Sequence, residues 1–309
     1  MAAVGSRFGK PMASLLRRMA LSPYVAGTRR GMEAKIKAKE FGRRMFSVEG
    51  RSKPPCFLGE EWSSLPLKSV STVNHDSKLF EFALPTDTTP LNLPVCACLL
   101  LKAPGIGEGG EDVVRPYTPV SDDLRTGSFD LLVKVYENGN ASQFLNNLSV
   151  GSRVEFKHIP FNVKEQYPFA KESLVMLCGG TGITPMYQAL QCLFREDGMD
   201  TDTKVTLLYA NKTEDDILLK EELDQMQKSN PDRLQVTYLL DHPSAGWDGV
   251  EGRIDAGLIQ KICPPPSEDQ LVFVCGPPGM YDVLCGQRGE KDVTGVLKDL
   301  GYCSTVVKF

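Results

Sequence analysis

Long apolar runs are missing from this sequence. The longest uninterrupted run is "VCACLLL" at 95–101, with seven residues, whereas a helix that crosses a bilayer needs about 20. We therefore expect no membrane-spanning helix. Of the 309 residues, 41% are hydrophobic and 24% charged. This is the composition of a globular protein, and the length allows about two domains.

Paired cysteines are missing as well. The nine cysteines are an odd number and are spread along the chain without a CxxC pair. Their distribution argues against a disulfide framework and favours a reducing compartment. The plant-type iron–sulfur spacing is also absent, and we expect neither a cluster nor another metal site. Cys96 and Cys98 form the one close pair, and we expect both to fill space on one face of a strand.

Acidic residues are scarce at the start of the chain. The first 46 residues hold 11 Lys and Arg against two Glu, which is a net charge of +9. Since the whole chain has a net charge of −4, the other 263 residues carry a net charge of −13. An Arg-rich, acid-poor head is typical of a mitochondrial presequence, and "RRMFS" at 43–47 offers a processing point after Phe46. We expect residues 1–46 to direct the protein to mitochondria. The alternative is a basic tail that stays in the cytosol or contacts acidic lipid.

The hydrophobic rhythm before residue 165 is typical of antiparallel strands. In "DLLVKVY" at 130–136, Leu132, Lys134 and Tyr136 share one face of the expected strand, and the residues between them share the other. Short segments of this kind are separated by turn sequences rich in glycine, proline and threonine. This pattern predicts an antiparallel barrel or sandwich, which we place at residues 60–161.

After residue 172 the strands become continuous apolar runs with helical segments between them. This pattern indicates a parallel sheet whose two faces are both covered. The runs are "SLVMLC" at 173–178, "VTLLYA" at 205–210, "LQVTYLL" at 234–240 and "LVFVC" at 271–275. We therefore predict an α/β domain over 173–309, joined to the first domain by a polar linker over 162–172.

Two glycine turns follow predicted strands of the second domain. The first, "LCGGTGITPM" at 177–186, does not match G-x-G-x-x-G, because Pro185 stands where the third glycine belongs, and it lacks the Walker lysine. We expect Thr184 to cap a helix that begins at about residue 185. The second turn is "CGPPGM" at 275–280. Both would lie at the carboxyl edge of the sheet, where α/β domains bind ligands, and together they predict a nucleotide site.

Two segments of the first domain carry groups suited to phosphate. In "VRPYTPVS" at 114–121, Arg115 can form a two-point pair with a phosphate, Tyr117 offers a face for stacking, and Thr118 offers a short donor. In "ENGNASQFL" at 137–145 a glycine turn leads into a short helix whose first N–H groups can face an anion. Taken together, the two segments describe a pyrophosphate site.

These motifs resemble one known family. "RPYTPVS", "DLLVKVY", "GNASQFL", "GGTGITPM", "YANKTEDDILLKEEL" and "CGPPGM" occur in the order and at the separations of the NADH–cytochrome b5 reductases, within the ferredoxin–NADP reductase superfamily. The resemblance covers about residues 60–309. It implies a flavoenzyme with FAD on the barrel and NADH on the α/β domain, which passes a hydride to FAD and then single electrons to a haem protein such as cytochrome b5.

The resemblance also implies roles for particular residues. Contacts to FAD fall to Arg115, Pro116, Tyr117, Thr118, Leu132, Lys134, Tyr136, Gly139, Asn140, Ala141, Ser142, Thr184 and Phe309. Contacts to NADH fall to Gly180, Thr181, Gly182, Asp241, Cys275, Gly276, Pro277 and Met280. Of these, Thr118, Lys134 and Cys275 are the expected catalytic residues. Asp241 would repel the 2′-phosphate of NADPH, and Lys212 is the nearest cation in the sequence, so we expect a preference for NADH.

Some features depart from the family pattern and leave alternatives open. "KHIPFN" at 157–162 replaces a glycine–proline turn, and Cys178 replaces a small apolar residue and is expected to be a buried thiol. The acidic body would slow association with an acidic cytochrome. The acceptor is therefore open to a quinone, a ferric chelate or another haem protein, and a flavin-binding redox sensor with exposed cysteines remains a second class. We assign no catalytic role to His75, His158 or His242.

Overall fold

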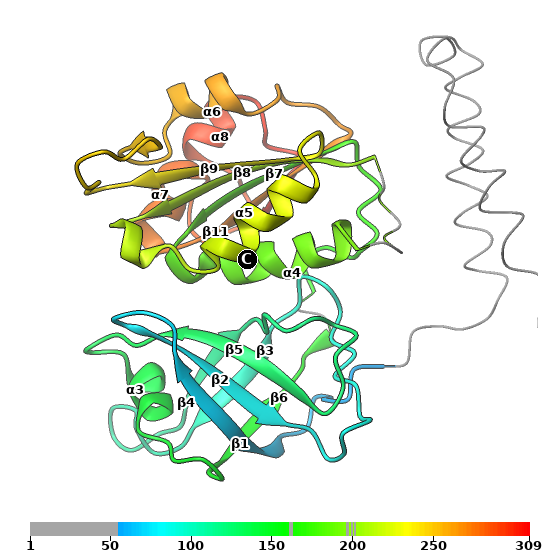
Figure 1. The fold of residues 1–309 in the computed structure, drawn as a ribbon, viewed down its shortest axis with the longest axis vertical. Helices are drawn as coiled ribbons and strands as arrows, with labels where there is room; N and C mark the ends of the chain where they lie inside the picture. The colour runs from blue at the N-terminus through cyan, green and yellow to red at the C-terminus, as the bar shows by residue number, and fades with distance from the viewer. Residues whose placement is uncertain (1–54, 161–162, 196–197, 199, 201) are drawn as a thin grey trace, which may run out of the picture. The chain divides into compact units, whose positions relative to one another are not determined.

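The computed structural model describes residues 55–160, 163–195, 198, 200 and 202–309, shown as the coloured ribbon in Figure 1. The expected presequence, residues 1–46, lies outside this range. Among the residues described, no helix has both the length and the apolar character needed to cross a membrane.

The first sheet is antiparallel throughout and has the strand order β4-β3-β6-β1-β2-β5. β4 and β5 lie at its two edges and do not pair with each other, so the barrel is not closed and we call it the half-barrel. The predicted antiparallel fold is confirmed. Its strands are β1 (Ser63–Thr72), β2 (Ser77–Ala83), β3 (Leu99–Ala103), β4 (Val113–Tyr117), β5 (Ser128–Lys134) and β6 (Arg153–Lys157), and one helix, α3 (Asn140–Asn146), follows β5.

The core of the half-barrel explains why β5 alternates. Leu131 and Val133 point into it and are buried, together with a cluster of three phenylalanines, Phe82, Phe129 and Phe156. The ring centroids in this cluster lie 4.7 to 5.7 Å apart. Because strand residues alternate between faces, the remaining residues of β5 face away from this core, as their shared face in the sequence predicts.

The second sheet is parallel throughout, as predicted, and has the order β10-β9-β8-β7-β11-β12. Its strands are β7 (Ser173–Gly179), β8 (Lys204–Asn211), β9 (Leu234–Leu240), β10 (Val250–Glu251), β11 (Gln270–Cys275) and β12 (Val306–Lys308). The helical segments are η2 (Gly180–Gly182), α4 (Ile183–Leu193), η3 (Glu214–Asp216), α5 (Lys220–Ser229), α6 (Ala256–Ile262), α7 (Pro278–Leu284) and α8 (Gly295–Asp299).

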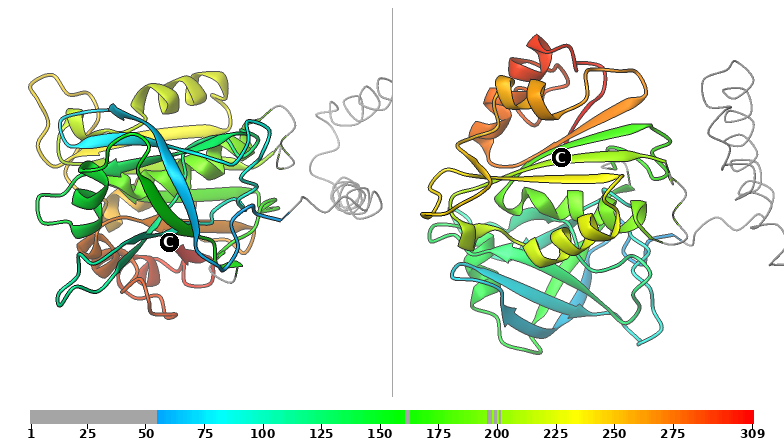
Figure 2. Two further views of the ribbon diagram at one scale, coloured as in Figure 1. Left: turned by 90° about the horizontal axis from the view of Figure 1, so that it is seen from below. Right: turned by 45° about the horizontal axis from the view of Figure 1, so that its top comes forward.

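Helices cover both faces of this sheet, with α4 and α5 on one face and α6, α7 and α8 on the other (Figures 1 and 2). Each face has its own hydrophobic core, so the sheet is buried on both sides. Ligands can reach such a sheet only at the ends of its strands.

The start of α4 differs from the prediction. The helix begins at Ile183, one short 3₁₀ turn after β7, and Gly182 is its N-cap. The expected Thr184 cap is therefore wrong: Thr184 lies inside the first turn, where its hydroxyl donates to the Thr181 carbonyl at 3.1 Å. The glycine turn folds into a 3₁₀ turn that leads straight into the helix, so the helix starts two residues earlier in the chain than predicted.

Helix α4 also packs against the half-barrel. The Gln188 side-chain oxygen accepts a bond from the Cys96 N–H at 2.6 Å, and the Gln191 amide donates to the Val120 carbonyl at 3.2 Å. These contacts tie the middle and the end of α4 to the half-barrel domain.

Candidate active site

A cavity of about 1450 Å³ lies where the two sheets meet. This volume exceeds the range of roughly 300–1,000 Å³ that suits one drug-sized ligand, so two ligands have room there. Every residue that the sequence predicted to contact FAD or NADH lines this one cavity. The structure thus brings together motifs that are up to about 190 positions apart, whereas the role of each residue remains a prediction.

The half-barrel wall offers a cation at its edge strand. The exposed Arg115 guanidinium on β4 donates only to the neighbouring Val114 carbonyl, at 2.8 Å, and within the described ranges no carboxylate pairs with it. Tyr117, two residues on, is partly buried, and burial raises the pKa of its hydroxyl to about 12. A guanidinium without an acidic partner beside an uncharged tyrosine fits a phosphate next to a flat ring.

The turn before α3 supplies a second group for an anion. A Cβ on Gly139 would lie 2.5 Å from the Ser142 Oγ and 2.9 Å from the Tyr136 Cβ, so only glycine fits there. The Ser142 hydroxyl closes the turn, because it accepts from the Tyr136 N–H at 3.1 Å and donates to the Gly139 carbonyl at 3.0 Å. The first N–H groups of a helix have no partner within it, and here they border the cavity.

Lys134, at the end of β5, carries a fixed positive charge in the cavity wall. Its Nζ lies 2.6 Å from the Asp76 Oδ2 and 2.8 Å from the Asp216 Oδ1. Although burial lowers the pKa of Lys134, the bonds to Asp216 and Asp76 raise it by more. The two carboxylates therefore favour the charged ammonium, which makes Lys134 a weaker proton donor than a free lysine. Because Asp216 belongs to η3, the bridge also ties the half-barrel to the α/β domain.

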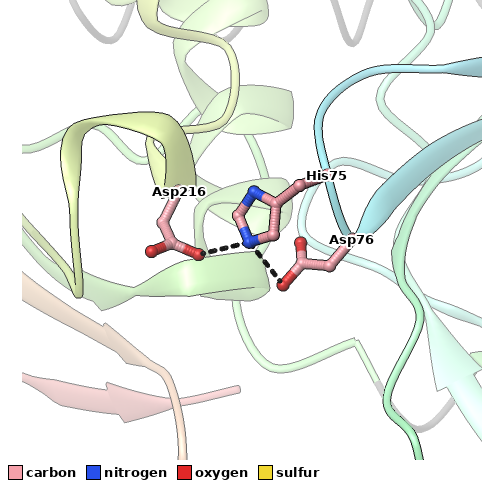
Figure 3. A group of neighbouring side chains, drawn as sticks. All are labelled: His75, Asp76 and Asp216. Atoms are coloured by element: carbon pink, nitrogen blue, oxygen red, sulfur yellow. Dashed lines mark ion pairs between the residues drawn. The ribbon is translucent and has the colours of Figure 1, made fainter.

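His75 joins this cluster from the turn between β1 and β2 (Figure 3). Its Nε2 lies 3.4 Å from the Asp76 Oδ2 and 3.7 Å from the Asp216 Oδ1. The three residues could offer ligands to a metal ion. Since the Lys134 ammonium already bridges both carboxylates, a metal ion would have to displace it, and we assign no metal site here.

The two glycine turns of the α/β domain touch each other. In the parallel register Cys178 of β7 lies opposite Cys275 of β11, so the turns that follow them are neighbours. A Cβ on Gly182 would lie 2.1 Å from the Cys275 carbonyl oxygen. Gly180 has φ +54° and open space where its Cβ would be, so a ligand can approach the backbone there.

The thiols near these turns are held in their neutral form. Burial raises the pKa of Cys275 to about 11 and raises that of Cys178 well above its usual value. Cys178 is fully buried, as predicted. Among all nine cysteines, only Cys303 is exposed. Neither thiol in the site is a thiolate at neutral pH, and the exposed cysteines that a redox sensor would need are reduced to one.

The chain's last residue is built into the wall. Phe309 packs edge-on against Phe273 with ring centroids 5.0 Å apart, its N–H donates to the Val274 carbonyl at 3.0 Å, and its carbonyl accepts from the Tyr281 hydroxyl. Lys308, beside it, donates to the carbonyls of Gln287, Glu290 and Asp292 at 2.8–3.1 Å. This lysine fixes the loop that carries Arg288 to the cavity.

Several cavity residues were missed by the sequence motifs. These are basic residues in loops or after strand ends, namely Lys164, Arg253 and Arg288. The expectation that Lys212 is the cation nearest Asp241 is wrong, because Arg253 forms a two-point ion pair with Asp241 at 3.2 and 3.3 Å. No local pattern marks these residues, and only strand register brings Arg253 beside Asp241.

The "KHIPFN" segment is only partly described, since residues 161–162 lie outside the described ranges. Within it, His158 is buried, and its ring nitrogen Nδ1 has no hydrogen-bond partner among the residues described. Burial lowers the pKa of His158, so this imidazole is neutral and belongs to the core of the half-barrel.

An antiparallel half-barrel with phosphate-binding groups, joined to a parallel sheet with glycine turns, defines a flavin- and nicotinamide-dependent oxidoreductase. Two family models agree: the oxidoreductase FAD-binding domain matches residues 64–159 and the oxidoreductase NAD-binding domain matches residues 176–286. The chain is 40% identical over 249 residues to NADH-cytochrome b5 reductase 2 of Aspergillus terreus, which covers 78% of this chain and 76% of that protein. This chain belongs to the NADH–cytochrome b5 reductase family.

Other relatives and solved structures agree with this assignment. NADH-cytochrome b5 reductase 2 of Meyerozyma guilliermondii is 40% identical, with 81% of this chain and 85% of that protein covered. The cytochrome b5 reductase domain of Ulva prolifera nitrate reductase superposes with a TM-score of 0.72 at 31% identity, over 82% of this chain and all of that domain. The protein is therefore an enzyme that uses NADH and FAD.

When bound, FAD supplies the chemistry, because it accepts a hydride and releases electrons one at a time. The chain supplies the geometry. Arg115 and the α3 turn fit the pyrophosphate, and the two glycine turns admit a second planar ligand close to the first. Thr184 and Pro185 of α4 and the C-terminal Phe309 complete the cavity wall.

Proposed function

We propose that this enzyme transfers electrons from NADH, by way of FAD, to cytochrome b5 or a similar haem protein. The cavity lined by both domains supports the proposal, since the residues expected to contact FAD and those expected to contact NADH line it together. The relatives' printed names support cytochrome b5 as the acceptor.

The charges around the cavity support an acidic acceptor. Although the chain beyond residue 46 is strongly acidic, the cavity is lined by six basic residues, Arg115, Lys134, Lys164, Lys212, Arg253 and Arg288, against two acidic ones, Asp216 and Asp241. A local excess of positive charge attracts anionic dinucleotides and steers an acidic protein towards the flavin, in spite of the net charge. The basic residues around the cavity therefore offset the repulsion expected between the acidic body of this enzyme and an acidic cytochrome.

A stopped-flow experiment tests the proposal with the purified full chain. NADH is mixed with the oxidised flavoprotein under anaerobic conditions, and the loss of flavin absorbance is followed before and after addition of oxidised cytochrome b5. We expect rapid flavin bleaching and then cytochrome reduction that slows as salt is raised, because steering is screened. If NADH bleaches the flavin but a quinone or ferric citrate re-oxidises the reduced flavin faster than the cytochrome does, the acceptor is a different one. Absence of yellow flavin would refute the proposal.

We also propose that the protein acts in mitochondria, because its first 46 residues have the charge pattern of a presequence. A fluorescent fusion of residues 1–60 is expected to accumulate in the organelle. A variant in which Arg17, Arg18, Arg29 and Arg30 are changed to Gln is the control and is expected to stay in the cytosol. Diffuse fluorescence from the unaltered fusion would contradict the proposal.

A further inference from the structure

Asp241 and Arg253 meet at the end of the cavity formed by β9 and β10. β9 ends at Leu240 and Asp241 follows it directly. β10 runs parallel to β9, with Glu251 opposite Leu240, and the Gly252 N–H donates to the Leu240 carbonyl at 2.8 Å. This register brings Arg253 beside Asp241, with Nε 3.2 Å from Oδ1 and Nη2 3.3 Å from Oδ2.

The pair leaves the arginine open to a second anion. The Arg253 side chain is 83% exposed and that of Asp241 is 25% exposed, and both residues line the cavity. A guanidinium has five N–H donors, and the pair with Asp241 engages only those on one edge. Among the described residues, no other carboxylate pairs with Arg253.

Lys212 adds a second cation at the same sheet edge. It follows β8, the strand next to β9, and its carbonyl accepts from the His242 N–H at 2.8 Å, which fixes it next to the residue after Asp241. Lys212 lines the cavity, whereas the exposed Glu251 does not. The segments that follow β8, β9 and β10 therefore bring Lys212, Asp241 and Arg253 to the cavity, which are two positive charges and one negative charge.

The two kinds of residue found here have opposite consequences for a dinucleotide. In α/β nucleotide sheets an acid after such a strand binds the ribose 2′-hydroxyl of NADH, whereas a nearby arginine accommodates the 2′-phosphate of NADPH. We propose that NADPH is a second electron donor for this enzyme, with its 2′-phosphate held by Arg253 and Lys212 while Arg253 neutralises Asp241.

The chemistry needs no additional reactant. NADPH gives up one hydride, with its electron pair, to the same flavin that accepts it from NADH, and leaves as NADP⁺. The inference rests on the proposed function in one respect, since both dinucleotides must bind across the same edge of the parallel sheet.

Steady-state kinetics of the holoenzyme with ferricyanide provide the first test. We expect a kcat/KM for NADPH within about tenfold of that for NADH. Arg253→Gln is expected to lower the NADPH-to-NADH ratio by about tenfold or more, the size of one charge-assisted hydrogen bond, and Arg253→Lys to restore part of it. Asp241→Asn is expected to raise the ratio, a change in the opposite direction that misfolding does not produce. Lys261→Gln removes a cation from the exposed surface of α6, outside the cavity, and is expected to leave the ratio unchanged.

Calorimetric binding of 2′,5′-ADP and 5′-AMP provides a second readout that needs no turnover. We expect 2′,5′-ADP to bind at least as tightly as 5′-AMP, and Arg253→Gln to weaken 2′,5′-ADP by about tenfold. Weaker binding of 2′,5′-ADP than of 5′-AMP, or an unchanged NADPH-to-NADH ratio in Arg253→Gln, would overturn the inference. If NADH itself fails to bleach the flavin, the proposed function fails instead, and the calorimetry still decides whether a 2′-phosphate is accepted.

Discussion

The half-barrel and the α/β domain build their halves of the cavity in different ways. The half-barrel offers side chains, such as Arg115, Tyr117 and Lys134, from strands whose other face packs a core. The α/β domain offers mainly backbone, from the glycine turns that follow β7 and β11. An antiparallel sheet with one covered face can bind ligands on its other face, whereas a parallel sheet covered on both faces binds at its strand ends.

This difference sets how each wall responds to mutation. On the half-barrel wall a substitution removes one contact and leaves the strand intact. On the α/β wall a new Cβ forces two turns apart, because the turns already touch. The predictions below test that contrast, beginning with the largest effect.

Gly182→Ala is expected to do the most damage. The added Cβ would sit 2.1 Å from the Cys275 carbonyl oxygen, and neither atom can move without shifting the backbone. We expect a loss of about 3 kcal/mol in the free energy of unfolding and NADH-dependent flavin reduction slowed on the order of 100-fold, since a misplacement of about 1 Å has that effect. Denaturant unfolding and stopped-flow absorbance measure both. Gly257→Ala in α6, with its nearest atom at 3.5 Å, is the control, and equal losses in the two variants would refute the contact argument.

Arg115→Ala is expected to weaken FAD binding and to leave the fold intact. Removal of the guanidinium withdraws charge-assisted hydrogen bonds worth about 2 kcal/mol from the pyrophosphate, which raises the FAD dissociation constant about 30-fold. The flavin-to-protein ratio after gel filtration reports the change. Arg153→Ala is the matched control, because Arg153 on β6 bonds Ser64 and does not line the cavity. Full flavin retention by Arg115→Ala would contradict its assigned role.

Lys308→Met tests an α/β feature that depends on a side chain. Lys308 is only 8% exposed, and methionine of similar length would leave the carbonyls of Gln287, Glu290 and Asp292 without their donor. We expect a loss of about 2 kcal/mol in the free energy of unfolding, together with faster hydrogen exchange in the loop over 286–292. Lys291→Met, at an exposed position in the same loop, should change neither measurement. Unaltered exchange in the loop would show that Lys308 does not hold it.

Glu81→Gln tests how the carboxylate charge of Glu81 contributes to the stability of the half-barrel, and we expect it to have the smallest effect of the four substitutions. Although burial raises the pKa of Glu81, hydrogen bonds from Lys68, Ser128 and Ser69 lower it to about 2, from an ordinary value of 4.5. A depressed folded pKa stabilises the protein above pH 4.5, and this stabilisation is lost as the pH falls towards 2. We expect Glu81→Gln to cost about 1 kcal/mol at pH 7.

Urea unfolding of the wild type and Glu81→Gln at pH 7, 4 and 3 measures this effect. The difference between the two proteins should shrink at the lower pH values. Glu60→Gln, at an exposed position, serves as the control. A difference that stays constant down to pH 3 would show that the carboxylate charge of Glu81 is not responsible.

The sequence predicted the fold well because the signals are local. The alternation in β5 follows from one covered sheet face, and the continuous apolar runs of β7, β8, β9 and β11 follow from two covered faces. Each of these strands therefore carries its own evidence of its sheet's class. Helix α4 buries a stripe of helical period in the same way, and its Met186, Ala189, Leu190 and Leu193 are at most 1% exposed. The predicted start of α4 was wrong, because the glycine turn coils into a 3₁₀ turn before the helix and Gly182 packs closely against the Cys275 carbonyl.

For this protein, the sequence alone determined the two domain classes, the family and many of the residues around the cavity, because motifs and hydrophobic periods are properties of short segments. Tertiary structure alone decided which charges meet. Lys134 with Asp216 and Arg253 with Asp241 are separated by 82 and 12 positions, and an ion pair at such a distance depends on strand register and domain contact. The ion pair between Arg253 and Asp241, on which the proposed use of NADPH depends, is therefore a feature of the folded chain only.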